Sequence, residues 1–462
     1  MGDRKLFGII KIKDGEPSDM ERRVYQLGRN IMIGWHILEG RSRDIIDFDL
    51  NAKGRKESFM SVATAMKVSG PSIADRAQVV EVLKRLAADF KAIPTDKIAN
   101  QHNFDLAQAQ IKASTAFARR LRGERLDPIR YMEDASGLEM SEEVVPEETL
   151  ETQTKTVLTF AQAMGIPELD ERSLDGFRND RQLNDVESKT ALEAAVKKST
   201  AQLEKFLGQD FDYPAPIKQE VKDAPYSAWA YTDPTTAEFS IRENLFGRIW
   251  TPGRAEEMGS HEGTHVNRMG KRKDQIRTGN LDRFFGLTTV HGPESAVEEG
   301  LAQTITFFIP GAFESLSPEG QFQVQSYILK QMVLSNVSIM LNCGEGADAK
   351  TVSEYIYRFL PWESQAEIDR QIIWRTDHKL NQIYLPQYGF GAAHFMRYAA
   401  NLNDAGKKEF LRQLFSKPYT LKQTDELFSD LSKNPRYVRV NGVNSGRSSS
   451  PFQISKGTSL AG

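Results

Sequence analysis

The stretch "MGSHEGTHVNRMG", residues 258–270, contains two histidines four residues apart, His261 and His265, with Glu262 directly after the first. On an α-helix, residues i and i+4 lie one turn apart on the same face, so both imidazoles can face one metal ion. Glu262 then lies beside them, close enough to take a proton from a water without being a ligand. The pattern predicts a zinc site carried by a helix, to which a third ligand must be added.

The third ligand is expected from "VHGPESAVEEGLAQTITFF", residues 290–308. Glu294, Glu298 and Glu299 occur there among small and apolar residues, and burying three carboxylates is costly unless a cation compensates them. We predict Glu299 as the ligand, because Gly300 behind it would let the two metal-bearing helices pack closely. Glu294 is the alternative ligand, and one of the two remaining glutamates would hydrogen-bond a ligand histidine. The alternative interpretation needs no metal: the three glutamates could form a solvated first helical turn, where the helix dipole favours negative charge.

The composition is that of an ordinary soluble globular protein. The chain has 462 residues, 39% hydrophobic and 27% charged, and a net charge of -3, which argues against nucleic acid or an anionic membrane as a partner. Its one cysteine, Cys343, excludes an internal disulfide and fits a reducing compartment. No apolar run approaches the roughly 18 residues of a membrane span, and the short run near the start does not resemble a signal peptide. We therefore expect a cytoplasmic protein, and the oligomeric state stays open.

Most of the chain has the apolar periodicity of amphipathic helices, for example over residues 19–40, 72–93 and 105–124, with Asp105 as a plausible helix start. The pattern changes to alternation at residues 226–231 and 237–243, which predicts a β-hairpin directly before the histidine motif. An exposed strand edge there could pair with an extended peptide and hold it beside the metal, or the hairpin could merely cover the core.

Three regions are expected along the chain. Residues 1–210 form an N-terminal helical region, residues 211–433 carry the metal motif, and residues 434–462 lose hydrophobic periodicity and fill with Ser and Gly. The last segment is predicted to be a mostly disordered tail.

The motifs resemble those of known zinc peptidases. "HEGTHV" followed by "VEEGLA" is similar to gluzincins, and among them to the tubulin-tyrosine carboxypeptidase family, although this chain has one residue fewer between the histidines. "YLPQYGFGAAHFMRYAA", residues 384–400, resembles the Tyr-Gly segment of carboxypeptidase Taq-like enzymes and of a bacterial group with an EGW ligand motif. The resemblance covers about residues 220–425. It implies a mainly α, two-lobed helical zincin with a small hairpin or sheet beside the active-site cleft.

The resemblance also implies roles for individual residues. Tyr388 would hydrogen-bond the oxyanion, and Gly391 would be the glycine one helical turn further on. Four basic residues near this segment could contact a substrate carboxylate or backbone, although a structural or solvated role is equally compatible: Arg375, His378, His394 and Arg397. His291, before a Gly-Pro pair, is a surface residue or a substrate contact.

The sequence therefore predicts a zinc-dependent peptidase acting on a peptide or protein substrate. His261, His265 and Glu299 would bind Zn²⁺, Glu262 would act as general base, and Tyr388 would stabilise the oxyanion. A carboxypeptidase is preferred, because both closest resemblances are to carboxypeptidases. The alternatives are a zinc endopeptidase, a zinc hydrolase of a non-peptide bond, and a non-catalytic helical interaction scaffold with a degenerate metal site.

Overall fold

The structure is a computed structural model that describes residues 46–50, 76–94, 100–137, 144–223, 226–232, 238–281, 283–290, 292–343, 346–376 and 380–439. Within these ranges the chain forms fourteen α-helices: α3 (Arg76–Lys91), α4 (Gln101–Leu121), α5 (Pro128–Ser136), α6 (Glu147–Ala163), α7 (Glu171–Asp180), α8 (Asp185–Leu207), α9 (Pro252–Arg277), α10 (Ser295–Phe308), α11 (Pro318–Asn342), α12 (Ala349–Phe359), α13 (Gln365–Thr376), α14 (Asn381–Asn401), α15 (Asp404–Ser416) and α16 (Leu421–Ser432). A short 3-10 helix spans Arg283–Gly286. The predicted mainly helical class is confirmed.

The five described strands are β1 (Ile46–Asp49), β2 (Ile217–Glu220), β3 (Ala228–Thr232), β4 (Phe239–Asn244) and β5 (Leu287–Thr289). β3 and β4 pair antiparallel, which confirms the predicted hairpin. The sequence did not predict β2, which pairs parallel to β4 on its other side. The order β2-β4-β3 leaves β3 at one edge of the small sheet, and β1 pairs with β5 in a separate ribbon.

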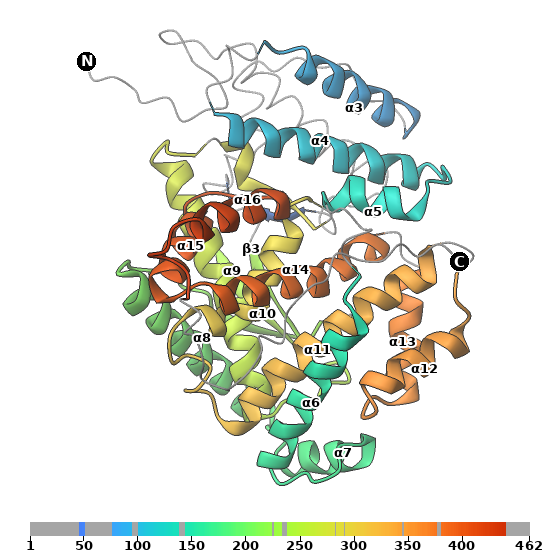
Figure 1. The fold of residues 1–462 in the computed structure, drawn as a ribbon, viewed down its shortest axis with the longest axis vertical. Helices are drawn as coiled ribbons and strands as arrows, with labels where there is room; N and C mark the ends of the chain where they lie inside the picture. Colours follow the sequence, from blue (N-terminus) through green and yellow to red (C-terminus); the bar gives the residue numbers. More distant parts are fainter. Residues whose placement is uncertain are drawn as a thin grey trace.

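The histidine helix α9 lies inside the molecule, and other helices surround it (Figure 1). It begins sharply, because the Thr251 side chain caps the Arg254 N–H and Pro252 occupies the first turn. On one side α8 comes so close that a Cβ at Gly259 would meet the Ala195 side chain. α10 and α11 pack on other sides, and α14 crosses both of them.

Two hydrophobic cores hold the helices together. The larger joins residues of α3, α4 and α8, such as Phe117 and Leu203, to α10 and α14, such as Phe308 and Phe395. The smaller is built by α6, α11 and α12. Both cores thus combine segments from before and after residue 210. No helix in the described ranges has the length and apolar character needed to cross a bilayer.

Some sequence predictions change or fall outside the described residues. The helix expected at Asp105 begins at Gln101 instead, because Asn100 caps the Asn103 N–H, and Asp105 accepts a hydrogen bond from the Gln101 side chain. Residues 434–439 contact the start of α15, since Tyr437 accepts a hydrogen bond from the Asn403 N–H. The helix predicted at 19–40 and residues 440–462 lie outside the described residues.

Candidate metal centre

Three buried side chains from two helices converge on one point. On α9, His261 Nε2 and His265 Nε2 lie 3.1 Å apart, and Glu299 Oε2 of α10 lies 3.3 Å and 3.5 Å from them. All three residues are less than 8% exposed. They form a group that could hold a metal ion. Of the candidate ligand glutamates, Glu299 is the one that joins the histidines.

The triangle of ligand atoms has the size that a zinc ion requires. Ligand bonds of about 2.0–2.1 Å in a tetrahedron place neighbouring ligand atoms about 3.3 Å apart. The observed edges of 3.1, 3.3 and 3.5 Å surround that value. Two imidazoles and one carboxylate are also a usual donor set for a zinc ion that keeps a fourth position open. The residues present therefore fit the metal that the motif predicts.

Electrostatics within the group favour a charged carboxylate facing the histidines. Burial alone would lower the pKa of His265, but the adjacent Glu299 carboxylate overrides it and raises this pKa to about 9. Burial conversely raises the pKa of Glu299, and the two imidazoles bring it well below its ordinary range. The site thus concentrates negative charge that a cation must balance, whether a proton or a metal ion.

Glu262 is held by the edge strand. Its Oε2 accepts a hydrogen bond from the Ala230 N–H of β3 at 2.6 Å, and its side chain is buried next to the histidines. Burial raises the pKa of this carboxyl above its usual value, against the opposing influence of His261 and His265. The hairpin thereby positions the residue predicted to be the general base, a function that the sequence did not indicate.

Two tyrosines on one face of α14 form a hydrogen-bonded chain to the metal group. The Tyr384 hydroxyl donates to Glu299 Oε1 at 2.7 Å and lies 2.7 Å from the Tyr388 hydroxyl. Because Tyr384 has a single proton and uses it on the carboxylate, Tyr388 must be the donor in the second bond. Burial raises the pKa of Tyr388 far above its ordinary value, so this hydroxyl keeps its proton. Tyr384 was missed, although its spacing of four from Tyr388 was a usable signal.

The other two glutamates of the α10 segment do not contact the histidines. Glu298 pairs with Arg268 at 3.0 Å and Arg272 at 3.1 Å, and Glu294 pairs with Arg272 at 2.7 Å. The expectation that one of them is an alternative ligand or bonds a ligand histidine was therefore wrong. Their charges are compensated by arginines of α9 itself. "HVNRMGKR" contained that signal, since its two arginines follow His261 at near-helical spacing.

The Nδ1 atom of His261 is buried and has no hydrogen-bond partner among the described residues. A metal-binding histidine usually donates a hydrogen bond from its second ring nitrogen, which fixes the orientation of the ring. Neither Glu294 nor Glu298 accepts such a bond from His261.

Glycines place α14 over the metal group. A Cβ on Gly300 would lie 2.5 Å from the carbonyl carbon of Gly391, and a Cβ on Gly391 would overlap the Ala296 carbonyl oxygen. Gly300 therefore allows α10 to approach α14, and the prediction that it brings the two metal-bearing helices together was wrong. Helix α14 also contacts α11, where the Ser335 hydroxyl donates a hydrogen bond to the carbonyl of Pro386, a residue inside α14.

Three basic residues that flank the tyrosine segment have partners other than the metal group: His394, Arg397 and Arg375. His394 and Arg397 contact Asp425 of α16 and line neither cavity described below, so the idea that they bind substrate is not supported. The Arg375 guanidinium bonds the Leu334 carbonyl and the Gln371 side chain, which ties α13 to α11. His291 and His378 fall outside the described residues.

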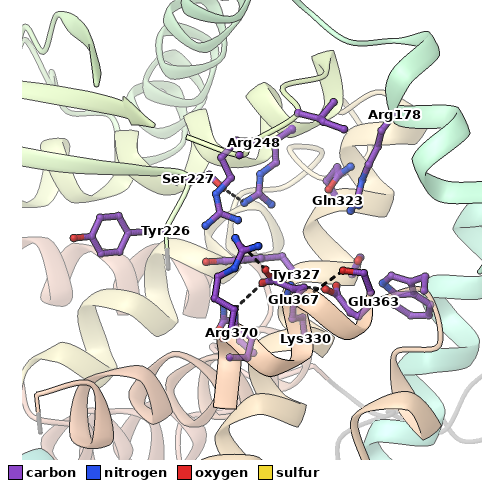
Figure 2. Close-up of a pocket in the computed structure, with 18 of the residues that line it drawn as sticks. Arg178, Tyr226, Ser227, Arg248, Gln323, Tyr327, Lys330, Glu363, Glu367 and Arg370 are labelled. Atoms are coloured by element: carbon purple, nitrogen blue, oxygen red, sulfur yellow. Dashed lines mark hydrogen bonds and ion pairs between the residues drawn. The ribbon is translucent and has the colours of Figure 1, made fainter. Parts of the chain in front are cut away.

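A cavity opens over the metal group. Its walls come from the β3 edge, α9, α10, α11 and α14, and its lining includes the metal group, Glu262, Ala228–Ala230, Tyr327, Tyr384 and Tyr388. A larger cavity, whose lining includes ten charged side chains of both signs, shares four lining residues with it: Tyr226, Ser227, Tyr327 and Tyr388. The two cavities therefore adjoin. Figure 2 shows the larger one, with Tyr226, Ser227 and Tyr327 among its lining residues.

No protein-family model matches the chain, and no curated protein matches its sequence. Among solved structures it is similar to one described as "the putative lipoprotein from Colwellia psychrerythraea", with a TM-score of 0.51, 13% identity, and coverage of 90% of this chain and 77% of that one.

Two peptidase structures give weaker matches. One is described as a "putative Oligoendopeptidase F", with a TM-score of 0.39, 11% identity and coverage of 89% and 72%. The other is a Pyrococcus furiosus carboxypeptidase, with a TM-score of 0.35, 12% identity and coverage of 91% and 90%. The first of the three likenesses shows a shared overall fold, and the chemistry of the site rests on its own residues.

Proposed function

We propose that this protein is a zinc-dependent peptidase. The observation that carries the proposal is the spatial set of three elements: the His261–His265–Glu299 group, the Glu262 carboxylate beside it, and the Tyr384–Tyr388 chain on the facing helix. A scaffold protein would need neither the Glu262 carboxylate nor the tyrosine chain. Zinc is the metal whose ligand types and distances this group fits.

A zinc ion held by this group would supply Lewis acidity, which acidifies water and polarises a carbonyl. Glu262 accepts the proton of the attacking water and passes it to the leaving amine. The hydrogen bond from the Ala230 N–H keeps its carboxylate pointed at that position. The Tyr388 hydroxyl then turns from Tyr384 to donate a hydrogen bond to the oxygen on which negative charge develops.

The edge strand supports a peptide as the substrate. The N–H of Ala230 points away from β4, because it donates to Glu262 rather than to the sheet. Alternate residues of a strand point their backbone groups to the same side, so Ala228 presents its polar groups toward the cavity as well. An extended peptide can pair with this edge and lie across the metal group. Removal of C-terminal residues is the preferred mode of cleavage.

Purified protein should contain about one zinc ion per chain by elemental analysis, and His265→Ala should remove it. Glu262→Gln should keep the zinc but lower peptide hydrolysis by about a hundredfold or more, because the general base is lost. Glu193→Gln, a change on α8 away from both cavities, serves as the control and should behave as wild type.

Mass spectrometry of a peptide library gives the mode of cleavage, since successive loss of C-terminal residues indicates a carboxypeptidase and internal cuts an endopeptidase. Zinc-free protein, or hydrolysis undiminished in Glu262→Gln, would refute the proposal and favour a scaffold.

A further inference from the structure

Four tyrosines line the cavity over the metal group, and they differ in how their hydroxyls are used. Tyr384 and Tyr388 form the hydrogen-bonded chain to Glu299. The Tyr226 hydroxyl accepts a hydrogen bond from a nearby lysine side chain. Among the described residues, no group hydrogen-bonds the hydroxyl of Tyr327 on α11. A phenol that faces a substrate cavity with its proton unused can donate it to a bound molecule.

Arg254 holds the ring of Tyr327 in place. Its guanidinium carbon lies 5.2 Å from the ring centre, within the range of a cation–π contact. The same guanidinium donates to Ser227 Oγ at 2.8 Å and pairs with Glu257 at 3.2 Å. The charge of Arg254 is thus already compensated, and its contribution here is to fix the ring beside the start of the edge strand.

The surroundings of Tyr327 make its hydroxyl a donor. Burial raises the pKa of this phenol above its ordinary value, and the Glu257 carboxylate raises it further, against the opposing influence of Arg254. Glu299 and Glu262 act in the same direction as Glu257, so the phenol lies within electrostatic reach of the metal group. The hydroxyl therefore keeps its proton, and it can donate that proton to an acceptor oxygen.

Tyr327 lies where the metal cavity meets the larger cavity, because it lines both. In the view of Figure 2 it lies between Ser227 and Lys330. Ser227 lines both cavities as well, and it precedes Ala230 by three residues, which is about 10 Å along an extended chain. A substrate atom beside Tyr327 is therefore within about three residues of the bond that Glu262 faces.

The free edge of β3 gives the substrate a direction. The Ser227 carbonyl accepts a hydrogen bond from the Asn244 N–H of β4, so the backbone groups of the alternate residues Ala228 and Ala230 face away from β4. A peptide that pairs antiparallel with this edge, the more stable arrangement per residue, runs from Ala230 toward Ser227. Its C-terminal side then passes Tyr327.

We propose that Tyr327 binds the substrate and that its hydroxyl donates a hydrogen bond to an oxygen on the C-terminal side of the cleaved bond. That oxygen belongs to a peptide carbonyl when the cut is internal, and to the C-terminal carboxylate when the last residue is released. This inference rests on the proposed peptidase function and adds a substrate-binding residue to it.

Tyr327 and Tyr388 then act at different stages. The oxygen that Tyr327 contacts is not the one on which negative charge develops, so its hydrogen bond is equally strong before and during the reaction. Such a bond changes KM, whereas the donor to the oxyanion changes kcat.

Tyr327→Phe removes the hydroxyl and keeps the ring that Arg254 contacts. We expect KM to rise about three- to tenfold if the acceptor is a carbonyl, and about tenfold or more if it is a carboxylate, with kcat and zinc content near wild type. Tyr357→Phe on α12, which lines neither cavity, is the matched control and should keep the wild-type KM. An unchanged KM in Tyr327→Phe would overturn the inference, as would a fall in kcat alone.

The acceptor is identified with fluorescein-labelled decapeptides of neutral residues. One series carries a single thioamide at each of the peptide bonds in turn, because sulfur accepts hydrogen bonds more weakly than oxygen. The other series compares a free with an amidated C-terminus. The change at the contacted oxygen should weaken binding to the wild type but not to Tyr327→Phe, where the donor is already missing. Such coupling to a thioamide identifies a carbonyl, and coupling to amidation identifies the carboxylate. Equal effects in both proteins throughout would refute the hydrogen bond.

A binding measurement separates the failure of this inference from the failure of the peptidase function. Fluorescence anisotropy with zinc-loaded Glu262→Gln protein reports the Kd of each peptide without hydrolysis. A higher Kd on adding Tyr327→Phe would support the contact even if the wild type cleaved no peptide. The same Kd for every peptide with and without this change would exclude the contact, and the peptidase proposal would still stand on its own test.

Discussion

At the scale of single residues, the two tyrosines of α14 differ in what they touch. Tyr384 donates to the ligand Glu299, whereas Tyr388 lines both cavities and contacts Tyr384. Removing a hydrogen bond to a metal ligand changes how firmly that ligand is oriented. Removing a donor that faces the developing charge changes the transition state. The two tyrosine hydroxyls, one helical turn apart, therefore have separable effects: one on metal binding and the other on the rate of the chemical step.

Tyr384→Phe should weaken zinc binding by about 10- to 100-fold, because Glu299 loses the hydrogen bond that orients it. Tyr388→Phe should keep most of the zinc affinity and lower kcat by about 10²- to 10³-fold through the loss of the oxyanion donor. A competition titration with a chromophoric chelator measures the affinities, and steady-state kinetics at saturating zinc measure kcat. Unchanged zinc affinity in Tyr384→Phe would contradict the positioning role.

At the scale of elements, the site depends on how closely α14 crosses α10. Gly300 and Gly391 meet at that crossing with no room for a side chain, and Gly389 packs equally closely against the Gln331 carbonyl of α11. Any increase in the separation would move the tyrosines away from Glu299, whose hydrogen bond to Tyr384 is 2.7 Å long. The geometry of the site therefore requires the close packing of α14 against α10 and α11.

Gly300→Ala should destabilise the fold by about 1–3 kcal/mol, the usual cost of an added methyl group in a packed interior. Hydrolysis should also fall, since α14 must shift. The control is Gly176→Ala in α7, where a Cβ would meet nothing within 4 Å, and this change should be neutral or stabilise by about 0.5–1 kcal/mol. Urea unfolding gives the free energies. If Gly300→Ala matched the control in stability, the close crossing would not be needed.

At the scale of the whole molecule, buried charges are stacked along α9. The Arg268 and Arg272 pairs with Glu298 and Glu294 are self-contained, but no Arg or Lys of the described residues pairs with Glu299, so protons on the histidines or a metal ion must balance its charge. Since the ligands come from two helices of the interior, a bound ion ties α9 to α10. Metal binding should therefore stabilise the native state as a whole.

Removing the metal with a chelator should lower the melting temperature. Zinc at a free concentration 100 times its dissociation constant contributes about 2.7 kcal/mol to the native state. Differential scanning fluorimetry before and after chelation measures the shift, and restored zinc should reverse it. His265→Ala should show no zinc-dependent shift, whereas Tyr388→Phe should retain it. A shift of the same size in His265→Ala would place the stabilising ion elsewhere.

Local sequence determined the parts of the site that depend on one element. His261, Glu262 and His265 were predictable because a helix repeats every 3.6 residues, and the hairpin was predictable because strands alternate. A glutamate as third ligand followed from the chemistry of zinc sites, whereas the choice of Glu299 rested on Gly300 packing against α9, and Gly300 instead meets Gly391 of α14. The mainly helical fold followed from apolar periodicity over the helices.

Only the tertiary structure decided which groups from different elements meet. Glu294 and Glu298 look equivalent to Glu299 in sequence, and their separation depends on which face of α10 the α9 arginines reach. The partner of the Ala230 N–H, the partner of Gly300 and the larger cavity likewise arise from segments far apart in the chain. Periodicity specifies which face of an element is buried, but the packing of whole elements determines what that face contacts.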